Sequence, residues 1–168
     1  CKRRGVVLIE DNAQAVGATF DGKALGTFGK AGILSFDYVK TITCGEGGAV
    51  ITDDPRVYEL VDAFCDHGHD HRGNDRGAEG HEHIGTNFRI SELNAAVGLA
   101  QVRKLDHILQ TQRRCQHFFI EGLADLPRVR FRTVPDPDGD SATFLTFFLP
   151  SEEEARKAAG ELASARVD

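Results

Sequence analysis

The spacing of hydrophobic positions changes along the chain, and it predicts different elements in different parts. In the first third, apolar residues come in short runs separated by glycine-containing turns, at 5–9, 31–36 and 48–52. Such runs predict strands, and the run at 6–9 has the continuous apolar character of a strand buried on both faces of a parallel sheet. Asp21-Gly22 lies between two short stretches and predicts a β-hairpin. The sheet is therefore expected in this part.

A helical spacing begins after this region. Asp54 and Pro55 predict an N-cap and a first helical position, and the apolar residues that follow recur at helical intervals until about Gly68. A longer helical pattern opens at Ser91 and predicts one long helix over 91–126. After it, 129–132 and 143–149 predict two strands, and Ser151 is the expected cap of a last helix.

These elements predict an α/β protein in three parts. Residues 1–90 are expected to form the sheet-bearing part. Residues 91–126 would form the linking helix, and 127–168 the start of a small α+β domain. A strand as apolar as 6–9 needs neighbours that this sequence has little room to supply. We therefore expect the chain to be a fragment in which both domains are incomplete.

Composition and charge narrow the class of partner. The 168 residues include 26 acidic and 20 basic ones, a net charge of −6, which argues against a general nucleic-acid or anionic-membrane surface. No run of about 18 apolar residues could span a bilayer. Four scattered cysteines match neither a zinc motif nor a disulfide scaffold, so a reducing cytoplasm is the expected compartment. A small molecule is the expected partner.

Two residues could carry chemistry near the predicted sheet. Asp11 follows the first strand, and the C-terminal ends of strands are where open α/β sheets place ligands. Lys40 stands in a segment with few charges, before the glycine turn at 45–48, where a desolvated amine could act as a nucleophile. The residues alone leave simpler interpretations open, because an aspartate can cap a turn and a lone lysine is usually a solvated surface residue.

The order of five features carries a family resemblance. They are Glu10-Asp11-Asn12-Ala13-Gln14, Ser35-Phe36, Lys40, Gly45-Glu46-Gly47-Gly48 and Gly85-Thr86-Asn87-Phe88-Arg89. Together they resemble the DegT/DnrJ/EryC1/StrS family of sugar aminotransferases. Within it, the segment 35–40 and the loop 66–71 look closest to 8-amino-3,8-dideoxy-manno-octulosonate transaminases. The resemblance implies a fold-type-I transferase dependent on pyridoxal 5'-phosphate (PLP), which moves an amino group from an amino acid, glutamate by expectation, to a keto-sugar. It also implies that 1–90 form the C-terminal part of the large PLP-binding domain, with a mixed, mostly parallel sheet.

The resemblance also implies roles for individual residues. Lys40 would form the Schiff base with PLP and transfer protons as a general acid/base. Asp11 would hold the pyridinium nitrogen, Gln14 would contact the ring hydroxyl, and Ser35 would bind the phosphate. Asn87 resembles the asparagine that reaches the phosphate of the neighbouring subunit's cofactor, which implies a homodimer.

The polar loop from 66 to 85 allows two interpretations, and we expect it to contribute nothing to a core. His67, His69, Arg72 and Arg76 would bind the carboxylate of an acidic sugar, because arginine offers a planar fork suited to that group. The alternative is a non-catalytic metal-binding α/β protein, since alternating imidazoles could coordinate a transition metal. We expect no metal site. The imidazoles are His67, His69, His71, His81 and His83.

Overall fold

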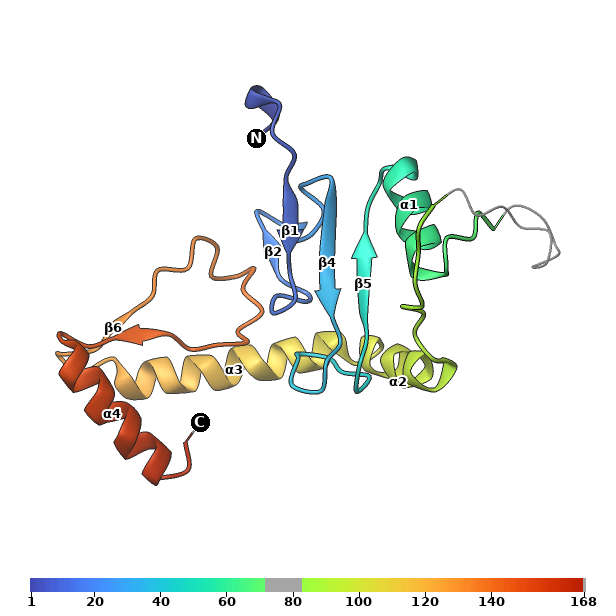
Figure 1. The fold of residues 1–168 in the computed structure, drawn as a ribbon. Helices are drawn as coiled ribbons and strands as arrows, with labels where there is room; N and C mark the ends of the chain where they lie inside the picture. The colour runs from blue at the N-terminus through green and yellow to red at the C-terminus, as the bar shows by residue number, and fades with distance from the viewer. Residues whose placement is uncertain (72–82, 168) are drawn as a thin grey trace.

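The structure of the chain is a computed structural model, and it describes residues 1–71 and 83–167 (Figure 1). It is a mixed α/β arrangement in which a small sheet stands against a run of helices. In chain order the elements are a 3₁₀ turn at Lys2–Arg4, β1 (Ile9–Asp11), β2 (Thr19–Phe20), β3 (Lys23–Ala24), β4 (Ala31–Ser35), β5 (Gly48–Ile51), α1 (Pro55–Cys65), α2 (Glu92–Val102), α3 (Leu105–Leu123), β6 (Arg130–Phe131), β7 (Phe147–Phe148) and α4 (Glu152–Ser164).

The main sheet has the order β1-β4-β5. β1 and β4 are parallel, and β5 returns antiparallel to β4, so the sheet is mixed as expected. The first strand differs from the prediction. It begins at Ile9 instead of 5, and its apolar residues are not buried within the described structure, because β1 lies at the edge of the sheet and Ile9 is 65% exposed.

The predicted hairpin is confirmed. β2 and β3 pair antiparallel with Thr19 opposite Ala24, and the turn between them is formed by Asp21 and Gly22. Both turn residues have positive φ angles, 50° and 74°, as a two-residue turn of this kind requires.

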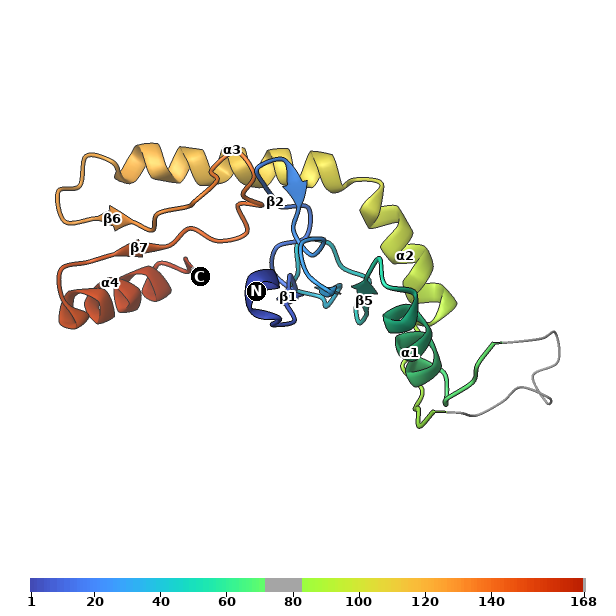
Figure 2. The same ribbon diagram turned by 90° about the horizontal axis from the view of Figure 1, so that it is seen from above.

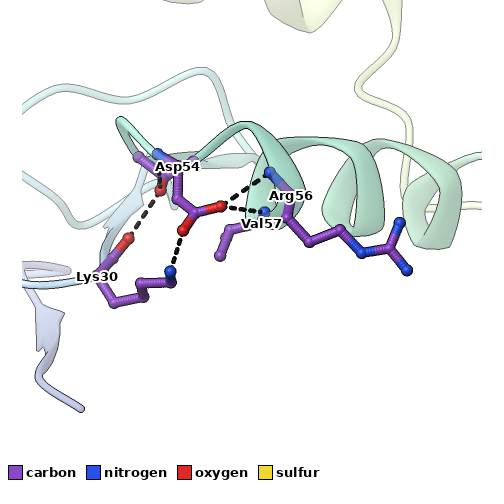
Figure 3. A network of polar contacts seen from close by, with 5 residues as sticks. Lys30, Asp54, Arg56 and Val57 are labelled. Atoms are coloured by element: carbon purple, nitrogen blue, oxygen red, sulfur yellow. Dashed lines mark hydrogen bonds and ion pairs between the residues drawn. The ribbon is translucent and has the colours of Figure 1, made fainter.

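The predicted start of α1 is also confirmed, and Figure 3 shows the contacts that fix it. The Asp54 carboxylate accepts hydrogen bonds from the backbone N–H groups of Arg56 (2.8 Å) and Val57 (3.1 Å), which the first helical turn leaves unpaired. Its other oxygen pairs with the Lys30 ammonium group. Thr52 connects the same two residues, because its hydroxyl donates to the Lys30 carbonyl and accepts from the Asp54 N–H. Lys30 therefore ties α1 to β4.

The prediction of one continuous helix over 91–126 was wrong. The chain forms α2 and α3, which meet at a clear angle (Figure 2). The break is at Arg103 and Lys104, where ψ is −18° and then 0°, well away from the roughly −42° of a regular α-helix. The apolar spacing hides this break, because Val102 before it and Leu105 after it line the same cavity beneath the sheet.

The small core lies between the sheet and α3. Its buried residues include members of the segment after β1, the loop after β4 and α3, namely Val16, Ala18, Ile42, Cys44 and Leu109. Beyond α3, β6 pairs with β7, and Ser151 caps α4 by accepting from the Glu154 N–H at 3.3 Å, as predicted. Among the described residues, no helix is both long and apolar enough to cross a membrane.

Candidate active site

Two of the predicted site residues end neighbouring parallel strands. Asp11 is the last residue of β1 and pairs in register with Ile33 of β4, two residues before Ser35. Because the strands run parallel, Asp11 and Ser35 lie at the same end of the sheet, where both strands have their C-terminal ends. The Asp11 carboxylate is exposed, and one oxygen accepts the Ala13 N–H at 3.0 Å. No hydrogen bond from the described residues reaches its other oxygen, which can accept one from a ligand.

Lys40 lies in a closed loop at that same end of the sheet. The loop leaves β4 and returns to β5, and it is closed where the Phe36 carbonyl accepts the Cys44 N–H at 2.9 Å. Inside it, the Lys40 N–H donates to the Asp37 carbonyl at 3.1 Å, and the lysine is half-buried. The Ser35 hydroxyl accepts the Asp37 N–H at 3.4 Å. Asp37 is thus hydrogen-bonded both to Ser35, at the end of β4, and to Lys40, in the loop that follows.

A pocket of about 400 Å³ opens beside Asp11 and Gln14. One wall is formed by the segment from Asp11 to the hairpin, and the other by the segment 132–144 of the second part of the chain. The polar residues of the second wall were not predicted as site residues, because the sequence pattern assigns them only to two expected strands and the loop between them. They are Arg132, Asp136, Asp140, Ser141 and Thr143.

Glu10 holds the neighbouring turn in place, a role that no local pattern of residues indicates. Its carboxylate accepts three backbone N–H groups, from Gly26 (2.7 Å), Phe28 (2.7 Å) and Gly29 (2.6 Å). Partial burial acts to raise the pKa of Glu10, but these three hydrogen bonds outweigh it and hold the pKa below its ordinary value. Residues alternate in direction along a strand, so Glu10 anchors β1 while Asp11 points to the other face.

The pocket's second wall is fastened to the hairpin. Asp136 accepts the Asp21 N–H at 2.8 Å, and the Gly139 carbonyl accepts the Thr19 N–H at 2.8 Å. Gly139 is buried in this contact, with no room for a side chain against Thr19. These bonds join residues more than 100 positions apart and fix the distance between the two walls.

Asn87 lies elsewhere in the chain. It forms an isolated bridge with Asp66, beyond β5 and next to the end of α1, on the opposite side of the sheet from β1 (Figures 1 and 2). Its side-chain oxygen accepts from the N–H and Nε of Arg89, both at 3.3 Å, and Arg89 also pairs with Asp66 at 3.2 Å. The structure therefore does not bring Asn87 together with Asp11 and Lys40 of the same chain.

The histidine loop is described only in part. His67 and His69 follow α1, and the His67 N–H donates to the carbonyl of Thr86, the residue before Asn87, at 3.1 Å, while Arg72, Arg76 and His81 fall outside the described residues. The expectation that 66–85 contributes nothing to a core was wrong for Asp66, which is 6% exposed and held by Arg89. Within 1–71 and 83–167, no three His, Cys, Asp or Glu side chains gather in a way that could hold a metal ion.

Comparison with known proteins agrees with this geometry. Residues 1–167 match the DegT/DnrJ/EryC1/StrS aminotransferase family. The chain is 30% identical over 159 residues to GDP-4-keto-6-deoxy-D-mannose 3-dehydratase of Escherichia coli O55:H7, covering 87% of this chain and 40% of that protein. It is 34% identical over 110 residues to UDP-4-amino-4,6-dideoxy-N-acetyl-beta-L-altrosamine transaminase of Helicobacter pylori, covering 66% and 29%. The chain thus spans less than half the length of these relatives.

Solved structures show the same fold. Helicobacter pylori PseC, an aminotransferase involved in the biosynthesis of pseudoaminic acid, superposes with a TM-score of 0.87 at 27% identity, covering 99% of this chain and 45% of that one. GDP-4-keto-6-deoxymannose-3-dehydratase with a trapped PLP-glutamate geminal diamine gives a TM-score of 0.85 at 28% identity, covering 97% and 46%. The fold is therefore part of the fold-type-I architecture, as predicted, and with the match over residues 1–167 the chain belongs to the DegT/DnrJ/EryC1/StrS aminotransferase family.

Proposed function

We propose that the natural protein is a PLP-dependent sugar aminotransferase, and that Lys40 is its catalytic lysine. The observation that carries this proposal is the meeting of Asp11, Ser35 and the Lys40 loop at one end of the sheet. A carboxylate, a hydroxyl and an amine at one end are the groups needed to hold a pyridinium nitrogen, a phosphate and an aldehyde. The residues present therefore fit PLP.

Each residue then has a separate task. When bound, PLP supplies the electron-accepting ring that stabilises negative charge at the substrate carbon. Asp11 would accept the ring N–H through its unoccupied oxygen, Gln14 would bind the ring hydroxyl, and Ser35 would donate to the phosphate. The Lys40 Nζ would attach the cofactor between turnovers and, when released, move a proton at the substrate carbon as general acid/base.

The substrates belong to the same proposal. The reaction would be a ping-pong exchange in which an amino acid gives its amine and a keto-sugar then accepts it. Glutamate is the proposed donor, supported by the similar dehydratase structure that contains a trapped PLP-glutamate geminal diamine. The proposed acceptor is an 8-keto octulosonate, supported only by the resemblance of 35–40 and 66–71 to that group of transaminases. Its carboxylate would be bound by His67, His69, Arg72 and Arg76.

The position of Asn87 supports a homodimer. It lies on the opposite side of the sheet from Asp11 and is exposed, so it is available to a site other than that of its own chain. We propose that it reaches the phosphate in the neighbouring subunit, and that the histidine loop beside it contributes to that same site. The parts of the chain would then be 1–90 in the cofactor-binding domain, 91–126 as the connection and 127–168 in the small domain, in a cytoplasmic enzyme.

The test uses the natural full-length protein and its Lys40→Ala variant. The wild-type protein should be yellow, borohydride should discharge the colour, and Lys40→Ala should lower the transamination rate at least roughly 10²-fold, the smallest usual contribution of a general acid/base. Lys157→Ala is the matched control, because Lys157 is exposed on α4 and its nearest pairing, to Glu161, is 3.9 Å long. Normal turnover by Lys40→Ala would reject the assignment.

Two other outcomes would reject the function itself. One of the similar proteins is a 3-dehydratase, so the product must be identified by mass spectrometry. Loss of water without gain of an amine would replace the transaminase proposal by a dehydratase. A colourless protein with stoichiometric zinc or nickel would favour the metal-binding alternative.

A further inference from the structure

The segment 140–144, opposite the Lys40 loop, is held at both ends by α3. The Asp140 carbonyl accepts the Arg113 Nε at 2.8 Å, and the Phe144 carbonyl accepts the Gln116 side-chain amide at 2.9 Å. Arg113 and Gln116 are three positions apart on the helix and therefore lie on the same face. The helix thus fixes where the short segment between these anchors can lie.

The middle of this segment has an unusual backbone. Ala142 has a φ of +56° and is 8% exposed. The left-handed region is unfavourable for a non-glycine residue, and such conformations persist only where the surrounding structure holds them. Here the α3 anchors provide that support. The turn at Ala142 determines how the two hydroxyl side chains on either side of it are directed.

Those two hydroxyls form a chain that ends beside Lys40. The Ser141 hydroxyl, in a residue that is 3% exposed, lies 3.0 Å from the Thr143 hydroxyl, which lies 3.2 Å from the hydroxyl of Thr41. Thr41 directly follows Lys40. Among the described residues, this is the one hydrogen bond by which 37–44 reaches beyond 35–47, because the other bonds of that stretch close the loop on itself.

We infer that the segment Ser141–Ala142–Thr143 is a positioning element for the catalytic lysine, acting through the Thr41 hydroxyl. The inference rests on the proposed function of Lys40. An anchored segment in a fixed conformation limits the movement of the Lys40 loop relative to Asp11, and reactions at an oriented group are sensitive to displacements of about 1 Å. Thr143 also lines the pocket beside Asp11, but in this assignment it acts on Lys40 through Thr41 and not at the reacting atoms.

The first experiment measures kinetics in the natural full-length holoenzyme. Thr143→Val removes the hydroxyl with little change in shape and should lower kcat about tenfold while the KM of the keto-sugar changes less than about twofold. Thr143→Ser keeps the hydroxyl and should restore kcat to within about threefold of wild type. Thr41→Val with Thr143→Val should be no worse than either alone, because the two act as one unit. Thr111→Val, an α3 threonine bonded to its own helix, is the matched control.

The second experiment needs no turnover. In cofactor-free protein, an amine-selective reagent is applied and the modification rates of Lys40 and Lys157 are compared by peptide mass spectrometry. Thr143→Val should raise the Lys40-to-Lys157 ratio roughly threefold by loosening the loop, and Thr143→Ser and Thr111→Val should leave it unchanged. Lys157 serves as an internal reference because its side chain is 78% exposed on α4.

The outcomes separate the inference from the function. If wild type is active and Thr143→Val equals Thr111→Val in kcat and in the lysine ratio, the positioning role is wrong and the proposed function stands. Thr143→Ser as poor as Thr143→Val, or a double variant showing the product of the two single losses, would also overturn it. A wild-type protein without transamination would reject the proposed function, and the lysine ratio would still decide whether Thr143 restrains Lys40.

Discussion

Replacing Glu10 by glutamine tests the energetics of the site's framework. The Glu10 carboxylate accepts from three backbone N–H groups, and glutamine has only one oxygen to offer. If that oxygen keeps the hydrogen bonds from the Phe28 and Gly29 N–H groups, the new NH₂ group lies opposite the Gly26 N–H. Both groups are donors, so the hydrogen bond of Gly26 is lost. Gly26 is buried, so water cannot easily take over the lost bond.

The expected loss follows from these contacts. A hydrogen bond to a charged group contributes about 1.5–3 kcal/mol to stability, and a buried donor left unpaired costs about 1–3 kcal/mol. Both figures describe the loss of the same hydrogen bond, so they are not added. We therefore expect Glu10→Gln to lower the free energy of unfolding by about 2 kcal/mol at neutral pH. For domains of about 150–250 residues this lowers the melting temperature by roughly 4–8 °C.

The effect should depend on pH in one direction. The pKa of Glu10 is held below its ordinary value, so its contribution is complete above the ordinary carboxyl pKa and is lost as the pH falls through the lowered folded-state pKa. The assay is thermal unfolding of the natural full-length protein, cofactor-free, at pH 7.5 and at steps into the acid range. Glu59→Gln is the control, since Glu59 is exposed and, within 1–71 and 83–167, its one ion pair is with Arg56 at 3.4 Å. Equal losses in the two variants at neutral pH, or a Glu10→Gln difference that does not shrink in acid, would refute the reasoning.

Two further predictions concern stability. Asp54→Ala should lower the melting temperature at neutral pH, and the difference from wild type should fade in acid. The reason is that the pKa of Asp54 is lowered, chiefly by Lys30, so that the stabilising contribution of the carboxylate disappears as the pH falls through that value. Asp54→Asn keeps the cap and should lower the melting temperature less, and an equal loss in both variants would contradict the capping role. Gly139→Ala should lower the free energy of unfolding in urea by about 1–3 kcal/mol, since its Cβ would lie 2.7 Å from Asp136 Oδ2 and 2.8 Å from Thr19 Oγ1. The control Gly160→Ala, with open space around it, should not be destabilised. Similar free energies of unfolding for the two variants would show that the loop adapts to the added methyl group.

The sequence predicted best those features that neighbouring residues decide. The Asp54 cap, the Asp21-Gly22 turn and the Ser151 cap each depend on a few adjacent positions, and all three are present. Asp11 and Ser35 were predicted to act together, and the parallel pairing of β1 with β4 places both at one end of the sheet. Their chemical roles stay predictions.

What the sequence could not predict depends on tertiary contacts. Thr41 and Thr143 are 102 residues apart, and no local pattern distinguishes their hydroxyls from those of other threonines. The break between α2 and α3 escaped for a different reason, because the apolar positions on both sides face one cavity and keep the spacing of a single helix. Asp66 was assigned to a polar loop by composition, although its burial depends on Arg89, 23 positions further on.

Because the chain turns at Arg103 and Lys104, a small rotation of α3 about this turn would displace residues further along the helix. Gln116, which holds the segment opposite Lys40, stands 11 positions beyond Leu105 and so about 16 Å along the helix, where a swing of about 5° at the turn would move it about 1.4 Å. That displacement would break the 3.2 Å contact between Thr143 and Thr41. The hydrogen bonds that Asp136 and Gly139 accept from the β2–β3 hairpin oppose this rotation, because they hold the segment 132–144 to the hairpin. The β2–β3 hairpin therefore limits how far the segment opposite Lys40 can move.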